Sequence, residues 1–229
     1  MSSFYQRLLA ETEEARRELL ATPALQLGSR GEIALRSYVA FLTEAYHHVK
    51  HTVPLLMACG ARLPERLEWL RAGIGDYIEE EMGHQEWILG DLRACGVDDE
   101  AVRLGPPHPT TEVMVAYAYD FIQRHNPVGL FGMVLVLEGT STHLASGAAQ
   151  AIGRSLGLPS DAFRYLSSHG ALDIGHMDFY RSLMDRLERE EDRRAVIHCA
   201  RMFYRLYGDM FRSLPLEQAP ILTSVARKH

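Results

Sequence analysis

The sequence predicts a single all-α domain, and three observations lead to this prediction. Apolar side chains recur along nearly the whole chain at steps of three and four residues, which is the spacing of a buried helical face. Alternating runs of β-branched residues, which are typical of strands, are missing. No repeat or low-complexity linker divides the 229 residues, so we expect one domain over residues 1–229 with its core at about 30–213.

The first segments are a charged amphipathic helix, a loop and a long core helix. The first helix is expected at 3–21 and stops before Pro23. Residues 23–31 contain two glycines besides this proline, and they are expected to form a loop. The core helix is expected at about 32–57, where Pro54 loosens the last turn.

Two further helices are separated by a proline-rich loop. The second long helix covers about 65–94 and ends near Gly96. The loop at 97–110 contains Gly-Pro-Pro and a further proline. The next helix is expected at about 111–124 and breaks before Pro127.

Three helices complete the predicted bundle. One spans about 128–156 and is closed by a glycine. The next spans about 160–189, and Ser160 with Asp161 can cap its start. The last spans about 192–213 and is stopped by Pro215.

Composition excludes several classes of function. Apolar residues make up 47% and charged residues 24%, as in ordinary globular proteins. The formal charge is −6, and no basic stripe is present, which argues against a nucleic-acid partner. No apolar run approaches about 18 residues, so no membrane span or membrane partner is expected. The three cysteines are far apart and without a C-x-x-C motif, which favours reduced thiols in a cytoplasmic protein.

The motif His169-x-x-x-Asp173-x-x-His176 is the most informative stretch of the chain. Steps of four and three residues place the three side chains on one face of a helix, among apolar neighbours. Burying such groups without partners costs several kcal/mol. They could form a polar network in the core, lie on a solvated face, or bind metal. The motif alone leaves these readings open.

Glu81 and His84 form an E-x-x-H motif on the second long helix. This spacing places a carboxylate and an imidazole one turn apart, as helical carboxylate-bridged metal sites require. A solvated acidic face is the alternative, and it fits Glu79, Glu80 and Glu86 well.

Two more helices contribute acidic candidates. Glu138 follows an almost fully apolar run, so a solvated face explains it poorly, and Gly139 after it would permit close approach of another helix. On the first core helix Glu44 is the best candidate ligand, with His47 or His48 as weaker ones.

This mixture of carboxylates and histidines suits iron or manganese better than a thiolate-rich zinc site. Carboxylates can bridge two ions, and two neighbouring ions can share the electrons needed to reduce O₂. Since no sulfur ligand or heme motif accompanies these residues, a two-metal site is the simplest interpretation.

With these motifs in this order, the chain resembles the heme-oxygenase-like diiron oxidases, relatives of thiaminase II and pyrroloquinoline-quinone synthase. The resemblance covers about residues 30–210. It implies a heme-oxygenase-like, thiaminase II-like bundle of about seven helices. It also implies two bound irons, Fe(II) or Fe(III), with manganese as another candidate metal. The implied ligands are Glu81, His84, Glu138, His169, Asp173 and His176. Glu44 is an optional further ligand.

The resemblance further implies an activity. O₂ would be the co-substrate, and a small amino- or carboxylate-bearing molecule would undergo N-oxygenation, oxidative C–C cleavage or desaturation. Arg164 or Arg181 is a guess for the partner of the substrate's charged group. The resemblance leaves a homodimer open. Candidate lining residues of the substrate cavity are Tyr46, Tyr77, Met82, Phe131, Met133 and Tyr180.

The activities of related families require residues that can be looked for in this sequence. Thiaminase II uses a cysteine on the third core helix, and no cysteine occurs between Cys95 and Cys199. Heme oxygenase uses a proximal histidine near the N-terminus, whereas the first histidine here is His47, and Gly129 with Gly132 only thinly match its glycine-rich helix. A cofactorless oxidase like pyrroloquinoline-quinone synthase, a ferritin-like bundle, and a non-enzymatic metal-binding protein remain as alternatives.

Overall fold

Eleven α-helices build the part of the chain that the structure describes. The computed structural model describes residues 3–216, and within them the side chains of all residues except 143 and 169–175. Three short 3₁₀ turns lie at Glu65–Leu67, Pro127–Gly129 and Ser160–Phe163. The α-helices are α1 (Phe4–Leu20), α2 (Pro23–Arg30), α3 (Leu35–Val49), α4 (Thr52–Arg62), α5 (Glu68–Glu81), α6 (His84–Ala94), α7 (Asp99–Leu104), α8 (Pro109–Arg124), α9 (Leu130–Leu156), α10 (Arg164–Asp185) and α11 (Glu190–Ser213).

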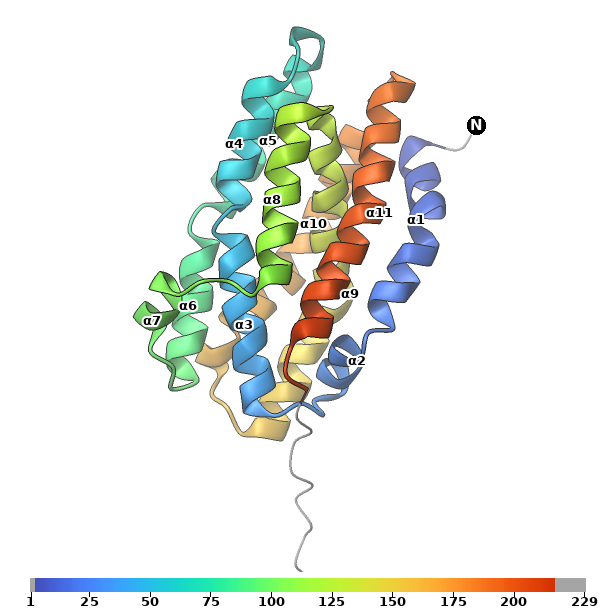
Figure 1. Cartoon of the computed structure of the whole chain (residues 1–229). Coiled ribbons are helices and arrows are strands. Elements are labelled where there is room, and N and C mark those ends of the chain that lie inside the picture. The colour runs from blue at the N-terminus through green and yellow to red at the C-terminus, as the bar shows by residue number, and fades with distance from the viewer. Residues whose placement is uncertain (1–2, 217–229) are drawn as a thin grey trace, which may run out of the picture.

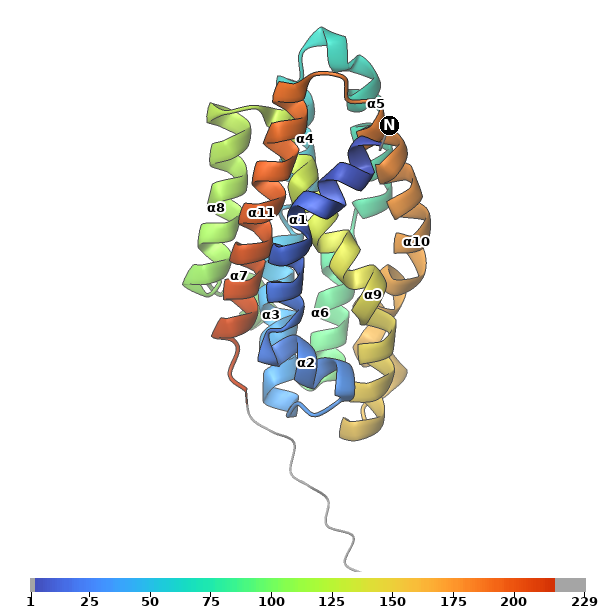
Figure 2. The same ribbon diagram turned by 90° about the vertical axis from the view of Figure 1, so that its right-hand side faces the viewer.

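The long helices run side by side along one axis of the molecule (Figures 1 and 2). α9 packs against both α10 and α11, and α2 closes over another part of α9. The first helix, α1, lies along the last, α11, on one side of the bundle, and the start of α1 lies beside the start of α11 (Figure 2). The predicted all-α fold class is therefore confirmed, with α9 as its central element.

The two predicted long helices are each broken in two. The helix expected at 32–57 ends at Val49, and a new helix begins at Thr52. The helix expected at 65–94 is interrupted at Met82 and Gly83, where Gly83 has a φ of 93°. Glycine adopts this left-handed conformation without the steric cost that a Cβ would bring. The break places Glu81 and His84 at two facing helix ends rather than on one continuous helix.

Both expected loops also contain helix. Pro23 begins α2, as its fixed φ suits a first helical position, and Gly31 ends it with a φ of 72°. The Asp98 side chain caps α7 by accepting from the backbone N–H groups of Glu100 and Ala101. These short helices and the two breaks explain why the described chain has more helices than the seven expected.

A buried aspartate from another helix caps the start of α10. The backbone N–H groups of Arg164 and Tyr165 donate to Asp91 of α6 at 3.0 and 2.9 Å. Ser160 and Asp161 make no such bond, so the predicted cap was wrong. The position of α10 therefore depends on α6, which is a contact that local sequence does not reveal.

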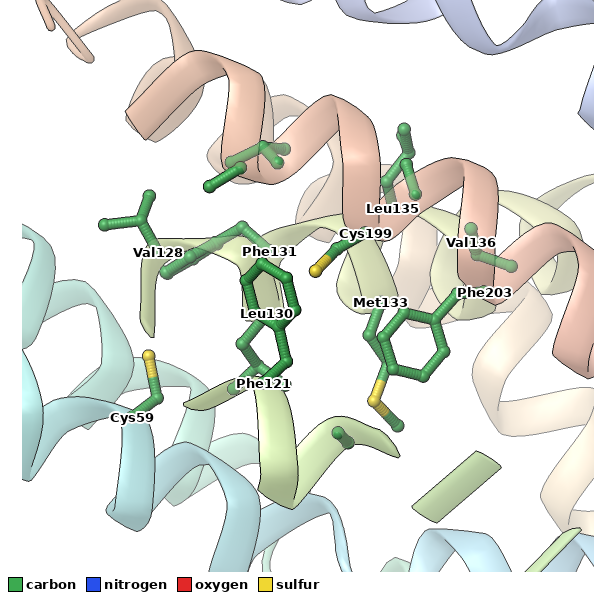
Figure 3. Close-up of a cluster of buried hydrophobic side chains, with 14 of the residues drawn as sticks. Cys59, Phe121, Val128, Leu130, Phe131, Met133, Leu135, Val136, Cys199 and Phe203 are labelled. Carbon is green, nitrogen blue, oxygen red and sulfur yellow. The ribbon is translucent and has the colours of Figure 1, made fainter. Parts of the chain in front are cut away.

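The larger core cluster lies where α8, α9 and α11 meet. Figure 3 shows Phe131 and Met133 of α9 beside Cys199 and Phe203 of α11. A Cβ at Gly132 would stand 2.4 Å from the backbone nitrogen of Ala200, so only glycine allows this approach. At Gly139, by contrast, no described atom would lie within 4 Å of a Cβ, so the expectation of a close helix contact there is not met.

α9 bends by 44° between residues Pro127–Thr142 and Leu144–Leu156. Three consecutive hydroxyls precede the bend: Thr140 donates to the carbonyl of Val136, and Ser141 and Thr142 both donate to the carbonyl of Glu138. Such back-bonding bends helices. Within residues 3–216 no single helix is long and apolar enough to cross a membrane, and only the two halves of α9, taken as a bent pair, meet the length and composition criteria.

Candidate metal centre

Three of the predicted ligands converge inside the bundle. Glu81 from the end of α5, Glu138 from α9 and His176 from α10 each offer a ligand atom, and these atoms lie within 4.8 Å of one another. Glu81 and His176 are buried, and Glu138 is half-buried. Two carboxylates and one imidazole at this separation are a donor set typical of iron or manganese sites.

His84 joins the group through Glu81. Its Nδ1 lies 3.1 Å from Oε2 of Glu81, although the chain between the two residues is not helical. The His84 ring stacks on Trp87 with 4.0 Å between ring centroids, and the guanidinium of Arg164 lies 4.9 Å from the Trp87 centroid. Hydrogen bonding and stacking, rather than helical periodicity, therefore hold the E-x-x-H pair together.

Glu80 is a member of the site that sequence reasoning missed. Its Oε2 lies 2.9 Å from Nε2 of His176. The sequence assigned Glu80 to a solvated acidic face, and its side chain is indeed 49% exposed. Only the position of α10 shows that this carboxylate contacts the imidazole. A histidine that is held by a carboxylate has a fixed ring orientation.

Two buried tyrosines report the environment of Glu138. Burial raises the pKa of Tyr77 and of Tyr180, and in both cases the negative charge of Glu138 raises it further. The hydroxyl of Tyr180 donates to the carbonyl of Phe131, whereas the hydroxyl of Tyr77 has no hydrogen-bond partner among the described residues. Negative charge is costly in such surroundings, and a bound cation would lower that cost.

A cavity of about 80 Å³ is lined by two of the three ligands, Glu81 and Glu138. Glu81, Glu138 and His48 are the polar ligand candidates in its wall, which is otherwise mostly apolar. Of the expected lining residues, only Tyr77 and Met133 line it.

The other expected lining residues lie elsewhere. Met82 is 64% exposed because the chain is extended at the break after α5. Tyr46, Phe131 and Tyr180 are buried in the core away from the cavity wall. The guessed substrate partners Arg164 and Arg181 do not line it either.

The remaining predicted ligands are placed as follows. Both carboxylate oxygens of Glu44 accept from the backbone N–H of His108, at 3.2 and 3.1 Å, and Glu44 is not in the converging group. His47 pairs its Nδ1 with the amine of Lys50 at 3.2 Å. Of these two histidines of α3, only His48 lines the cavity. The side chains of His169 and Asp173 lie outside the described residues, and their ligand roles stay predictions.

The three cysteines do not belong to this site. Burial raises the pKa of Cys59 and of Cys199 to about 12. Burial also raises the pKa of Cys95, to about 11. None of the three lines the cavity. A thiolate nucleophile of the thiaminase type therefore has no candidate here, because the thiolate is the reactive form.

Comparison with known proteins identifies the scaffold. The sequence profile of a family described as iron-containing redox enzymes matches residues 39–208. No curated protein matches the chain.

Solved structures share the fold at low sequence identity. A domain of unknown function with a heme oxygenase-like fold from Shewanella denitrificans is 22% identical, with a TM-score of 0.79 over 93% of this chain and 91% of that one. A TenA homolog from Pseudomonas syringae is 9% identical, with a TM-score of 0.78 over 91% of each chain. Heme oxygenase from Leptospira interrogans is 16% identical, with a TM-score of 0.76 over 93% of this chain and 100% of that one. These similarities confirm the predicted heme-oxygenase-like fold.

Proposed function

The chain belongs to the iron-containing redox enzyme family, and we propose that it is an O₂-activating non-heme diiron oxidase or oxygenase. The convergence of Glu81, Glu138 and His176 beside a mostly apolar cavity is the observation that supports this proposal most strongly. The donor set fits iron, since carboxylates and imidazole suit it and no thiol is nearby.

Two iron ions would be held by six residues, with manganese as another candidate metal. Glu81, Glu138 and His176 already lie together, and His84 lies against Glu81. His169 and Asp173 precede His176 on α10. Glu44 stays an optional seventh ligand, which would first have to give up its bonds from the backbone of His108.

Bound iron would supply the electrons for the reduction of O₂. The chain contributes positioning and a dry environment. Glu80 fixes the ring of His176, and Glu81 fixes the ring of His84. Apolar side chains from α4 and α9 line most of the cavity, which limits the access of water and strengthens electrostatic interactions inside it.

The substrate would be a small amino- or carboxylate-bearing molecule, bound in the cavity beside Glu138. N-oxygenation, oxidative C–C cleavage and desaturation are the reactions that such a site can support. We place the protein in the cytoplasm as part of the same proposal, because its three cysteines are free thiols.

Anaerobic titration with Fe(II), followed by exposure to O₂, tests the proposal. We expect about two Fe(II) per chain and O₂ consumption in a stopped-flow measurement. Glu138→Gln should lose iron while keeping its helical content, because the ligand carboxylate is replaced by a neutral isostere. Glu79→Gln is the matched control, since Glu79 is exposed on the same helix as Glu81 and should leave iron binding unchanged.

Less than one Fe(II) per chain, together with no O₂ consumption, would overturn the oxidase proposal. Tight iron binding without O₂ consumption under any condition would instead favour a metal-binding protein that is not an enzyme.

A further inference from the structure

A second cavity of about 90 Å³ lies beside the first. Its wall is built by α2, α3, α9, α10 and α11 together with the residues that follow α11. Leu25, Phe41, Leu144, Ala148 and Phe211 are representative of the wall. No acidic or basic residue occurs among the described side chains that line it. This cavity therefore suits an uncharged, apolar group.

The two cavities share part of their walls. Ser141 of α9, Tyr165 of α10 and Tyr207 of α11 line both of them. Tyr207 packs edge-on against His48, with 5.7 Å between ring centroids, and against Phe211 at 4.8 Å. His48 belongs to the first cavity and Phe211 to the second. Tyr207 thus stands between the two cavities.

One face of α9 runs along both cavities. Glu138, Ser141, Leu144, Ala148 and Ile152 follow one another at steps of three and four residues, and all five line one or both cavities. Measured along the bent helix, Glu138 and Ile152 are about 20 Å apart, at 1.5 Å per residue. Glu138 therefore stands at one end of a row of α9 side chains that line the two cavities.

We propose that the two cavities form one substrate site for a molecule with an unbranched aliphatic chain. The polar end of the substrate lies at Glu81 and Glu138, and the chain passes Tyr165 and Tyr207 into the second cavity. This assignment rests on the proposed function, since it places the reacting end of the substrate beside the iron ligands. It narrows the substrate class to single-headed amphiphiles, because a second charged group would be desolvated without a partner in the second cavity.

Calorimetric binding of unbranched ligands to the metal-free full chain tests the assignment. Three series are used below their critical micelle concentrations, namely n-alkylamines, n-alkanoates and n-alkanols, each from butyl to dodecyl. In at least one series we expect Kd to fall by roughly fourfold for each methylene added, since each buried CH₂ contributes about 0.8 kcal/mol. The series that binds identifies the head group that the first cavity accepts.

Ala148→Phe should fill the second cavity, because Ala148 is half-buried and lines it. Short ligands should still bind to this variant, and the gain in affinity for longer chains should disappear. Gln150→Phe is the matched control, with the same side chain added at an exposed position two residues away, and should behave like wild type. If Ala148→Phe does not fold, as judged by its thermal unfolding, the smaller Ala148→Leu replaces it.

No dependence of Kd on chain length in any series would overturn the assignment. An equal dependence in wild type and in a folded Ala148 variant would also overturn it. Fe(II) titration of the same proteins separates the two proposals: iron binding with no chain-length effect contradicts only the substrate assignment, whereas chain-length-dependent binding without iron binding contradicts the diiron proposal.

Discussion

The imidazole of His176 lies close to three carboxylates. Nε2 lies 2.9 Å from Glu80, and a ring nitrogen is part of the group with Glu81 and Glu138. At the scale of single residues, two roles can therefore be distinguished. Glu81, Glu138 and His176 would hold an ion, and Glu80 would orient the ring of His176. The sequence supports the assignment of Glu81, Glu138 and His176, since each interrupts an apolar stripe, but it gives no reason to single out Glu80 from its acidic neighbours.

Glu80→Gln should weaken iron binding by roughly 10- to 100-fold without removing it. The reason is that a carboxylate partner orients a metal-ligating histidine and raises its basicity. Competition with a calibrated Fe(II) chelator measures the change, and Glu79→Gln again serves as the control. An unchanged affinity in Glu80→Gln would show that the contact with His176 does not persist when iron is bound.

Asp91 gives a prediction about pH. Burial raises the pKa of its carboxyl to about 6, and the bonds from Tyr165 and Arg164 only partly offset this effect. The folded protein then holds this proton more tightly than the unfolded chain, whose aspartates have a pKa of about 3.9. Its contribution to stability is therefore present below about pH 4 and is lost as the pH rises through about 6.

Chemical denaturation of wild type and Asp91→Asn between pH 3.5 and 7 measures this contribution. The free energy of unfolding of wild type, relative to Asp91→Asn, should fall from about pH 4 to about pH 6 and then stay level. Asp98→Asn, at the exposed cap of α7, shows what the loss of charge does at another helix start. A rise of the relative stability over this range would contradict the assigned environment of Asp91.

At the scale of helices, interruptions place the ligands. The left-handed Gly83 lets α5 end at Glu81 and α6 begin at His84, and the three hydroxyls after Glu138 accompany the bend of α9. The period of the apolar residues correctly predicted that these segments are helices, because the helical spacing extends over many residues. It did not predict the break at Gly83, since glycine also occurs inside helices, as Gly132 does. The cap of α10 by Asp91 could not be predicted either, because it depends on the packing of two distant segments.

Gly132→Ala should destabilise the fold by about 1–3 kcal/mol or more. The added Cβ would stand 2.4 Å from the nitrogen of Ala200 and 2.5 Å from the carbonyl oxygen of Val196, and both are backbone atoms. Gly147→Ala is the matched control on the same helix, where no described atom lies within 4 Å of the new Cβ. That change should be neutral or stabilise by up to about 1 kcal/mol. Equal effects in urea unfolding would contradict the close approach of α9 and α11.

At the scale of the whole molecule, the fold does not determine the function, which depends on the residues of the site. Structures only 9–22% identical to this chain share its fold, and they include a heme oxygenase and a TenA homolog. The same bundle therefore accommodates different chemistry, and function has to be argued from the site. The fold class was predictable because helical patterning covers the whole chain, whereas the second cavity was not, because its wall joins residues far apart in sequence.

Iron should stabilise the whole bundle, because its ligands come from α5, α9 and α10. At free Fe(II) about 100-fold above Kd, binding contributes about 2.7 kcal/mol. For a chain of this size the gain corresponds to a rise in Tm of roughly 5–10 °C. Anaerobic calorimetry measures it, with Glu138→Gln expected to show little or no rise. A similar rise in both proteins would place the bound iron elsewhere.

Diffraction from anaerobically Fe(II)-loaded crystals, recorded on both sides of the iron absorption edge, tests the central claim most directly. We predict anomalous peaks for two ions in contact with Glu81, Glu138 and His176. Iron peaks only at other positions, or none in a protein that consumes O₂, would contradict the proposed metal centre.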